Sequence, residues 1–162
     1  SVNEEVVHGI PSENKIIHDG DLVSVDCGAI IEGWHGDAAI TICVGNVKPE
    51  HKKLSEITEK ALQIGIDAAL PGKKIGDIGF AIEKFVRSFK DLKLGILEDY
   101  VGHGIGTQMH MPPSVPNYGK AGTGWRSIAC QRFPSTSDVG RPLIHDAQLR
   151  RNNTIAVGLL AP

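Results

Sequence analysis

The chain has 162 residues, of which 41% are hydrophobic and 22% charged, as expected for one globular domain with a substantial core. Its formal net charge of −2 gives no electrostatic basis for binding nucleic acid or a membrane surface, and no apolar run approaches the ~20 residues needed to span a bilayer. Three cysteines without a Cys-x-x-Cys spacing, and no export leader at Ser1, favour a reducing compartment, so we expect a cytoplasmic monomer.

Two β-strands are predicted in the first third of the chain. Leu22–Val25 is rich in β-branched and aliphatic residues, and Ala38–Val44 has the same character. Glu32-Gly33, between them, has the residues of a tight turn. The segment therefore predicts an antiparallel hairpin.

Two amphipathic helices are predicted next. Apolar residues recur at intervals of three and four along Pro49–Leu70, and Pro71-Gly72 ends the pattern. A second helix opens near Asp77, and its apolar stripe consists of Ile78, Ala81, Ile82, Phe85, Val86 and Phe89. Leu94–Val101 then predicts a strand that enters a glycine-rich turn at Gly102–Gly106. This order of elements predicts an α+β fold.

The composition changes after Gly119. Residues 1–120 contain eleven Lys and one Arg, whereas residues 121–162 contain five Arg and no Lys or Glu. Apart from a short apolar run at Ile155–Leu160, this tail follows neither the helical nor the strand period. A solvated, loop-rich C-terminus is one interpretation. A junction with unrelated coding, such as a frameshift or an alternative end, is the one we favour, so we divide the chain into residues 1–119 and a divergent tail, residues 120–162.

Asp26 and Asp37 lie on opposite sides of the predicted turn. Because paired residues of an antiparallel hairpin have a constant sum of residue numbers, a two-residue turn at Ile31-Glu32 or at Glu32-Gly33 gives an odd sum. In either register both side chains lie on one face, directly opposed or on a diagonal. Two such carboxylates repel each other unless a cation lies between them, and a divalent metal ion meets that need. Two aspartates on a solvated face, or capping the turn, are the alternative.

Three histidines lie in tight, glycine- or proline-rich settings. His103 is bracketed by Gly102 and Gly104, so little side-chain bulk hinders a ligand from reaching its imidazole. His110 follows it along the chain, and His8 precedes Gly9-Ile10-Pro11. A histidine in a loop is more often a surface residue than a ligand. We interpret the remaining histidines, which lack such a context, as solvated: His18, His35, His51 and His145.

Five short motifs occur in a fixed order along residues 1–119. They are HGIP at 8–11, GDLVSVDCG at 20–28, GWHGDAAIT at 33–41, VGHGIG at 101–106 and MHMPPSVPNYG at 109–119. Together they resemble the type I methionine aminopeptidases, metallopeptidases of the pita-bread fold. Related pita-bread enzymes that cleave Xaa-Pro bonds share the ligand types, but HGIP together with VPNYG indicates the methionine branch. The resemblance implies the first half of that α+β fold.

The resemblance also implies a two-metal site. Asp26 would chelate one divalent ion, Asp37 would bridge two, and His103 would ligate one of them. Co, Mn, Fe and Zn are the metals that such ligands suit. Family members complete the site with two glutamates from the second half of the fold, but no glutamate follows Glu98 here.

Three further residues match positions that contact the substrate in the family. The resemblance implies that His110 stabilises the tetrahedral intermediate and that His8 contacts the substrate amide near the leaving group. Met109 would line an apolar pocket for the methionine side chain, with plain core packing as the alternative. The implied substrates are the N-terminal methionine peptides of nascent proteins, with the ribosome as a candidate setting.

The missing glutamates separate three hypotheses. The leading one is a methionine aminopeptidase whose chain, as written, is a truncated or miscoded copy that binds metal weakly and turns over slowly or not at all. The second is a non-catalytic pita-bread module that binds peptides or the ribosome. The third is a small hydrolase whose tail completes the site, although Asp138 and Asp146, the only acidic residues of that tail, have no matching context.

Overall fold

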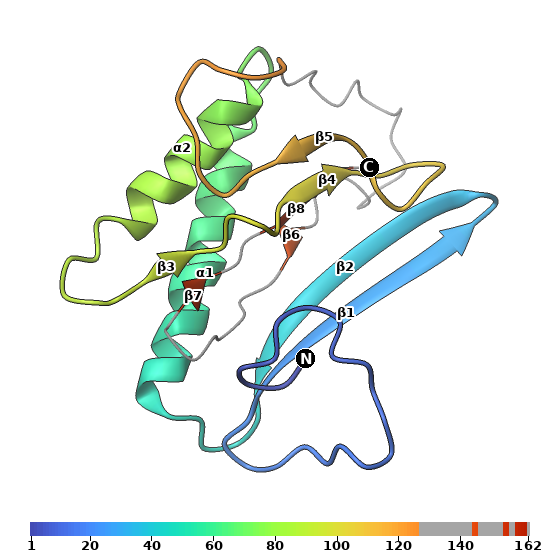
Figure 1. Ribbon diagram of the computed structural model, residues 1–162, viewed down its shortest axis with the longest axis vertical. Helices are drawn as coiled ribbons and strands as arrows, with labels where there is room; N and C mark the ends of the chain where they lie inside the picture. The colour runs from blue at the N-terminus through green and yellow to red at the C-terminus, as the bar shows by residue number, and fades with distance from the viewer. Residues whose placement is uncertain (127–143, 146–153, 156–157, 162) are drawn as a thin grey trace.

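The computed structural model describes residues 1–126, 144–145, 154–155 and 158–161 of the chain. Two helices lie side by side next to several short strands, and a long β-hairpin forms a separate arm (Figure 1). Neither of these helices is long and apolar enough to cross a membrane. The predicted α+β class is confirmed for this part of the chain.

The arm is an antiparallel hairpin of β1 (Leu22–Ile31) and β2 (Trp34–Cys43), joined by Glu32 and Gly33. Both turn residues have a positive φ, 51° and 83° respectively. Positive φ at both central residues is the backbone of a type I′ turn, whose twist matches that of the flanking strands. The predicted hairpin and its turn at Glu32-Gly33 are confirmed, although the strands are longer than the sequence indicated.

The register of the hairpin decides which side chains share a face. Asp26 pairs with Ala39, and Gly28 pairs with Asp37. Side chains of paired residues point to the same side of a sheet, so Asp26 and Asp37 are diagonal neighbours on one face. The predicted shared face is therefore confirmed, in the diagonal one of the two registers.

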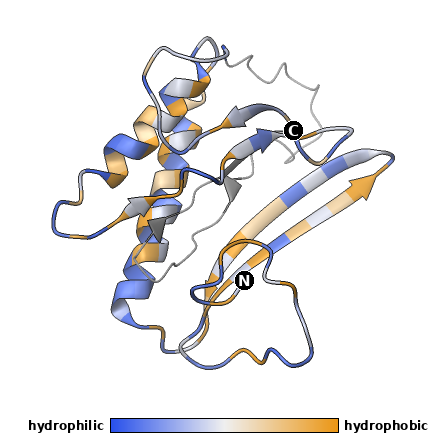
Figure 2. Ribbon diagram, viewed as in Figure 1, coloured by the Kyte–Doolittle hydropathy of each residue, from blue (hydrophilic) through white to orange (hydrophobic). Residues whose placement is uncertain are grey.

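The opposite face of the hairpin is apolar and open to solvent. Val25 pairs with Ile40, and these side chains are 44% and 61% exposed. Ile42 continues the same row, and Ile31 and Trp34 extend it to the turn. Figure 2 shows apolar residues alternating with polar ones along both strands.

The helices α1 (Pro49–Ala68) and α2 (Ile75–Val86) form the core with their facing apolar stripes. The strands contribute one residue from β1 and one from β5 (Met111–Val115), so the helices cover the start of the hairpin and the end of β5. The buried cluster consists of Leu22, Leu54, Ile57, Ala61, Ile78, Ile82, Val86 and Val115. This core fixes the base of the arm relative to the rest of the chain.

Two limits of α2 differ from the prediction. The helix begins at Ile75, before the predicted start near Asp77, because Asp77 lies in its first turn and its carboxylate accepts a hydrogen bond from the backbone N–H of Lys74 at 2.8 Å. It ends at Val86, so Phe89 lies outside the helix. Phe89 still joins the apolar stripe, because its ring packs edge-on against Phe85 with centroids 5.2 Å apart.

The strand predicted at Leu94–Val101 is confirmed only at Gly95–Ile96, and the turn predicted at Gly102–Gly106 is wrong for its first three residues. A strand needs a hydrogen-bonded neighbour, and only β3 (Gly95–Ile96) has one, in β7 (Thr154–Ile155). Gly102–Gly104 instead forms β4, which pairs with β5.

Absent side chains explain why the glycine-rich segment becomes a strand. A Cβ on Gly104 would lie 2.4 Å from the carbonyl oxygen of Pro112, so the two backbones meet only because Gly104 has none. The full sheet order is β5-β4-β8-β6, with β6 at Ile144–His145 and β8 at Gly158–Ala161.

The first residues of the predicted tail are attached to the N-terminus of α2. The amide of Gly76 donates to Thr123 O at 3.0 Å, and the amide of Gly122 donates to the Asp77 carboxylate at 2.7 Å. Most of the remaining tail lies outside the described residues, as does the side chain of His145. The division into residues 1–119 and 120–162 therefore stays a prediction.

A methyl group added to Gly79 should destabilise the fold. Its Cβ would lie 2.3 Å from Tyr118 O and 2.7 Å from Pro116 O, and backbone carbonyls cannot yield as a side chain can. We expect Gly79→Ala to lower the free energy of unfolding by about 1–3 kcal/mol in urea denaturation. Gly65→Ala is the matched helical control, because its Cβ would meet side chains alone, Ile82 at 2.9 Å and Ile78 at 3.7 Å, and no backbone. Equal stability of Gly79→Ala and the wild type would contradict the packing of α2 on this segment.

The cap of α2 should depend on pH. The backbone N–H of Lys74, and then that of Gly122, hold the pKa of Asp77 below its ordinary value. A carboxylate with a lowered folded-state pKa stabilises the fold above the unfolded-state pKa of about 3.9, and this contribution is lost as the pH falls through the folded value. Asp77→Asn should thus lower the thermal midpoint at pH 7, and this deficit should shrink as the pH falls below about 3.9, with exposed Asp91→Asn as control. A decrease in the thermal midpoint of Asp77→Asn that does not change with pH would contradict a stabilising role of the ionised Asp77 carboxylate.

Candidate metal centre

The aspartate pair lies on the polar face of the hairpin. Asp26 is exposed and Asp37 is half-buried. Diagonal neighbours in an antiparallel pair have side chains about 7–8 Å apart at their origins, which lets two carboxylates reach one ion between them. On the same face, the hydroxyl oxygens of Ser24 and Thr41 are 3.2 Å apart. Both aspartates take part in further interactions, so they are not isolated charges.

His103 and His110 stand side by side where β4 and β5 meet their connecting loop. Their ring centroids are 4.3 Å apart with the planes tilted by 56°. The Nδ1 of half-buried His103 lies 2.9 Å from the carbonyl oxygen of Gly104. Since a carbonyl only accepts, Nδ1 is the donor, and Nε2 is the ring nitrogen left to ligate a metal ion. An imidazole that donates one N–H to a backbone carbonyl is oriented as metal-ligating histidines usually are.

Met109 lies against the hairpin next to Asp37. A Cβ built on Gly28 would lie 2.8 Å from the Met109 methyl carbon and 3.9 Å from Oδ1 of Asp37. The Met109 side chain is half-buried and is not part of the core between the helices. Met109 therefore lies outside the helical core, and its role in lining a substrate pocket stays a prediction.

His8 lies in a strained turn at the other side of β1. Val7 and His8 both have a positive φ, 26° and 52°, which costs a non-glycine residue of the order of 1–3 kcal/mol. The His8 side chain is exposed and lines a cavity of about 330 Å³ that Asp26 also lines. His8 and Asp26 line one open cavity, and the role predicted for His8 in contacting the substrate stays a prediction.

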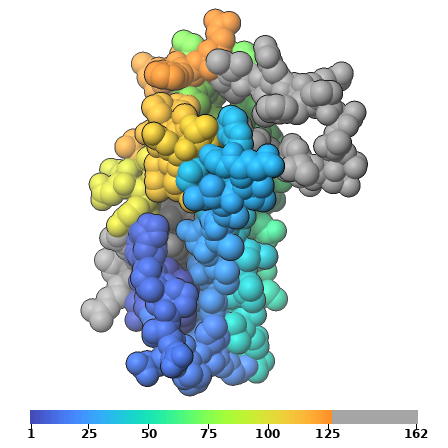
Figure 3. Space-filling view, turned by 90° about the vertical axis from the view of Figure 1, so that its right-hand side faces the viewer, coloured from blue at the N-terminus to red at the C-terminus, as the bar shows by residue number. Residues whose placement is uncertain are grey.

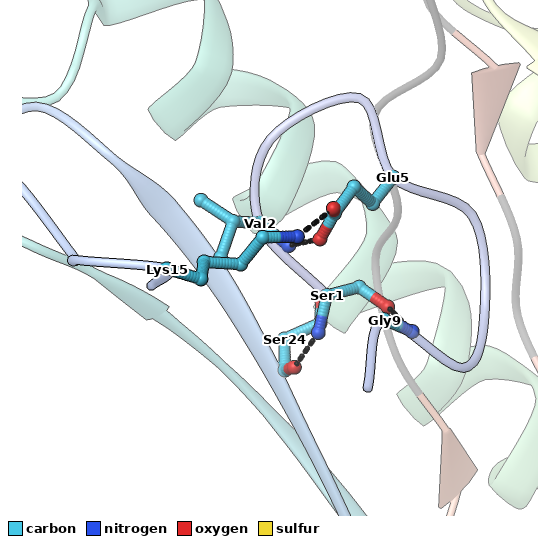
Figure 4. Close-up of polar contacts among 6 residues, drawn as sticks. All are labelled: Ser1, Val2, Glu5, Gly9, Lys15 and Ser24. Carbon is cyan, nitrogen blue, oxygen red and sulfur yellow. Dashed lines mark hydrogen bonds and ion pairs between the residues drawn. The ribbon is translucent and has the colours of Figure 1, made fainter. Parts of the chain in front are cut away.

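The segment that carries His8 is held against β1 by backbone contacts. The amino group of Ser1 donates to Ser24 O at 2.8 Å, and the amide of Gly9 donates to the Ser1 hydroxyl at 3.1 Å (Figure 4). Glu5 accepts from the amide of Val2 at 2.8 Å and pairs with Lys15. These contacts form the wall of the cavity opposite β1.

A larger cavity of about 440 Å³ lies elsewhere, between the N-terminus of α2 and β5. Its lining includes Ile75, Pro113, Tyr118 and Trp125 and none of the predicted site residues. It is therefore separate from the candidate metal centre.

The predicted ligands are only partly assembled. Within the described residues, no three His, Cys, Asp or Glu side chains come close enough together to hold a metal ion, so His103 does not join the aspartates in one cluster. The chemistry of the donors still fits a divalent cation, because two carboxylates share one face and the His103 ring is oriented by its carbonyl. The three metal ligands thus stay a prediction, with Asp26 and Asp37 its best-placed members.

His35 was overlooked by sequence reasoning. We predicted it to be solvated, but it is half-buried, and its Nδ1 lies 3.2 Å from the carbonyl oxygen of Gly106. His51 is also only partly exposed, whereas His18 is exposed as predicted. Alternation along β2 offered a signal for His35, since it lies two residues before Asp37 and so on the same face.

Comparisons with known proteins identify the family. The sequence profile of metallopeptidase family M24 matches residues 1–157. The methionine aminopeptidase of Clostridium acetobutylicum is 48% identical over 124 residues, which are 76% of this chain and 48% of that protein. The chain belongs to metallopeptidase family M24. It spans about half the length of the curated relatives it matches.

Solved structures support the pita-bread fold. The crystal structure of methionine aminopeptidase from Thermotoga maritima is 43% identical, with a TM-score of 0.73 over 79% of this chain and 50% of that one. The prolidase of Pyrococcus furiosus is more distant, at 27% identity and a TM-score of 0.59 over 72% of this chain and 34% of that one. The described part of the chain therefore has the architecture of about half of such a fold, and its similarity is greater to the methionine branch.

Removing the charge of Asp37 should weaken metal binding. If Asp26 and Asp37 hold a divalent ion together, Asp37→Asn leaves one carboxylate and should raise the dissociation constant for Mn²⁺ about tenfold or more in calorimetric titration. Exposed Asp91→Asn, which makes the same change of charge after α2, should bind as the wild type does. Equal affinities of the Asp37 and Asp91 variants would place the metal elsewhere.

Proposed function

We propose that the polypeptide functions as a metallo-aminopeptidase that removes the initiator methionine from new proteins by two-metal hydrolysis. The observation that carries this proposal is the hairpin register, which places Asp26 and Asp37 on one face. The similarity to methionine aminopeptidases supports it, although the matched relatives are about twice as long as the matched segment. These relatives give no support to a non-catalytic peptide- or ribosome-binding module.

The substrate proposed is a peptide with an N-terminal methionine. Met109 supports this choice, because its flexible thioether side chain lies beside Asp37 and can form part of an apolar pocket. The open cavity between His8 and Asp26, about 330 Å³, gives a short peptide room to approach the same face. New proteins emerge in the cytoplasm, which is the proposed compartment.

The residues present can share the work of peptide hydrolysis. Asp26, Asp37 and His103 would hold the divalent ions, with Nε2 of His103 as its ligating atom. Bound ions would polarise the scissile carbonyl and lower the pKa of a coordinated water. His110 is exposed at the edge of this region, where a ring N–H can donate to the oxygen that gains negative charge in the transition state. His8 would donate to the substrate amide from its strained turn.

Hydrolysis by these 162 residues alone should be slow. A hydrolytic site needs a group that takes the proton from the attacking water, and the family uses a glutamate for this step. The sequence has no glutamate after Glu98. On this face of the hairpin the carboxylates are those of Asp26 and Asp37, which are proposed to hold the metal ions. We therefore propose weak metal binding and a low rate for the polypeptide as it stands.

A peptide assay tests the proposed function. We expect slow release of methionine from Met-Ala-Ser in the presence of Mn²⁺ or Co²⁺, and no release when a chelator is added. Leucine should not be released from Leu-Ala-Ser. Asp37→Asn should abolish the release, whereas Asp91→Asn should leave it unchanged. Release that survives the chelator would refute a metallopeptidase, and a robust rate would refute the proposed low activity.

A further inference from the structure

The loop between β4 and β5, residues 105–110, touches the tip of the hairpin through Gly106. The carbonyl oxygen of Gly106 accepts two hydrogen bonds from one residue of β2: the backbone N–H of His35 at 2.7 Å and its ring Nδ1 at 3.2 Å. Figure 3 shows the light-blue tip of the hairpin against the yellow segment that contains β4 and β5. His35 therefore joins two segments that are 71 residues apart in the sequence.

Gly106 is enclosed on its other side. A Cβ at this position would lie 3.2 Å from the Met111 sulfur and 3.6 Å from the Trp34 ring. The amide of Gly106 donates to Gln108 O at 3.1 Å, which closes the loop on itself. Gly106 is thus held on two sides: its carbonyl accepts hydrogen bonds from His35, and its Cα faces Trp34 and Met111.

A second contact joins the same loop to the hairpin. The Met109 methyl group lies against Gly28, whose paired residue is Asp37. His110 follows Met109 directly, and its ring lies 4.3 Å from that of His103. The loop is therefore held at Gly106 and at Met109, and these two points determine how His110 lies relative to the aspartate face.

We propose that His35 is a positioning residue, which fixes loop 105–110 through the hydrogen bond from its ring Nδ1 to the Gly106 carbonyl. Because a carbonyl only accepts, the ring Nδ1 of His35 is the donor of this hydrogen bond. By holding Gly106, His35 fixes Met109 beside Gly28 and Asp37, and it fixes the loop that carries His110 next to His103. The consequence for peptide cleavage rests on the proposed function, whereas the attachment of the loop stands on the contacts themselves.

Three substitutions at His35 distinguish the two ring nitrogens. Asn places its amide N–H near the position of Nδ1, Gln places it near Nε2, and Leu offers no donor of either kind. If Nδ1 holds the loop, His35→Asn should behave as the wild type does, while His35→Gln and His35→Leu should loosen it and leave only the backbone hydrogen bond from position 35 to Gly106 O. His18→Leu, at an exposed histidine before the hairpin, is the matched control.

Hydrogen–deuterium exchange followed by mass spectrometry measures the release. Loss of one neutral hydrogen bond should speed exchange in peptides that span residues 105–110 by about three- to tenfold in the Leu and Gln variants. Exchange of β1 and β2 around Val25 and Ile40 should not change in any variant, which shows that the hairpin is intact. An unchanged loop in His35→Leu, or release by Asn as large as by Gln, would overturn the proposal.

A second measurement separates this proposal from the proposed function. The ¹⁵N shifts of the His35 ring should report a protonated Nδ1 in the wild type, and an unprotonated Nδ1 would overturn the assignment. Mn²⁺ titration of the same wild-type sample tests the metal centre independently. If the wild type binds no Mn²⁺ but its loop is protected from exchange, the proposed peptidase function is refuted and the role of His35 stands. If it binds Mn²⁺ but exchange of the loop does not depend on His35, the role of His35 is refuted and the proposed function stands.

Discussion

The register of one hairpin governs the candidate site. The left-handed backbone at Glu32 and Gly33 closes a type I′ turn, and this turn fixes every pair along β1 and β2. Because side chains alternate between faces, a slip of one residue in β2 alone would move Asp37 to the face opposite Asp26. The same slip would separate Asp37 from Gly28, the residue that Met109 contacts. The chemistry proposed for this face therefore depends on a two-residue turn at its far end.

Close approach of backbones brings the second half of the site to the hairpin. Glycines stand at each contact: Gly28 receives Met109, Gly106 faces the Trp34 ring, and Gly104 meets Pro112 between β4 and β5. A Cβ at Gly104 would push the two strands apart, because it would meet backbone, whereas a Cβ at Gly28 or Gly106 would displace the end of a methionine side chain. The strings of glycine around His103 thus serve less to expose an imidazole, as the sequence suggested, than to let strands and loop come together around it.

The features that the sequence predicted correctly are those determined by residues close together in the chain. The two helices, the hairpin, its turn and the shared face of Asp26 and Asp37 follow from periodicity and turn chemistry over a few residues. What depends on distant partners was missed. β4 forms where β5 and β8 lie beside it, and half-buried His35 contacts Gly106, which is 71 residues away. Whether His103 shares a metal with the aspartates is likewise a question of tertiary arrangement that no spacing in the sequence can answer.

The solvent-facing row of Val25, Ile40 and Ile42 bears on how the polypeptide behaves in solution. Within the described residues, this sheet has only two strands, so its backbone edges are largely free to pair with further strands. An exposed apolar sheet face with unpaired edges promotes self-association of the polypeptide. Colloidal stability, rather than unfolding, will then limit the concentration at which the polypeptide can be handled, and charged substitutions at Ile40 or Ile42 are the natural remedy because they leave the aspartate face untouched.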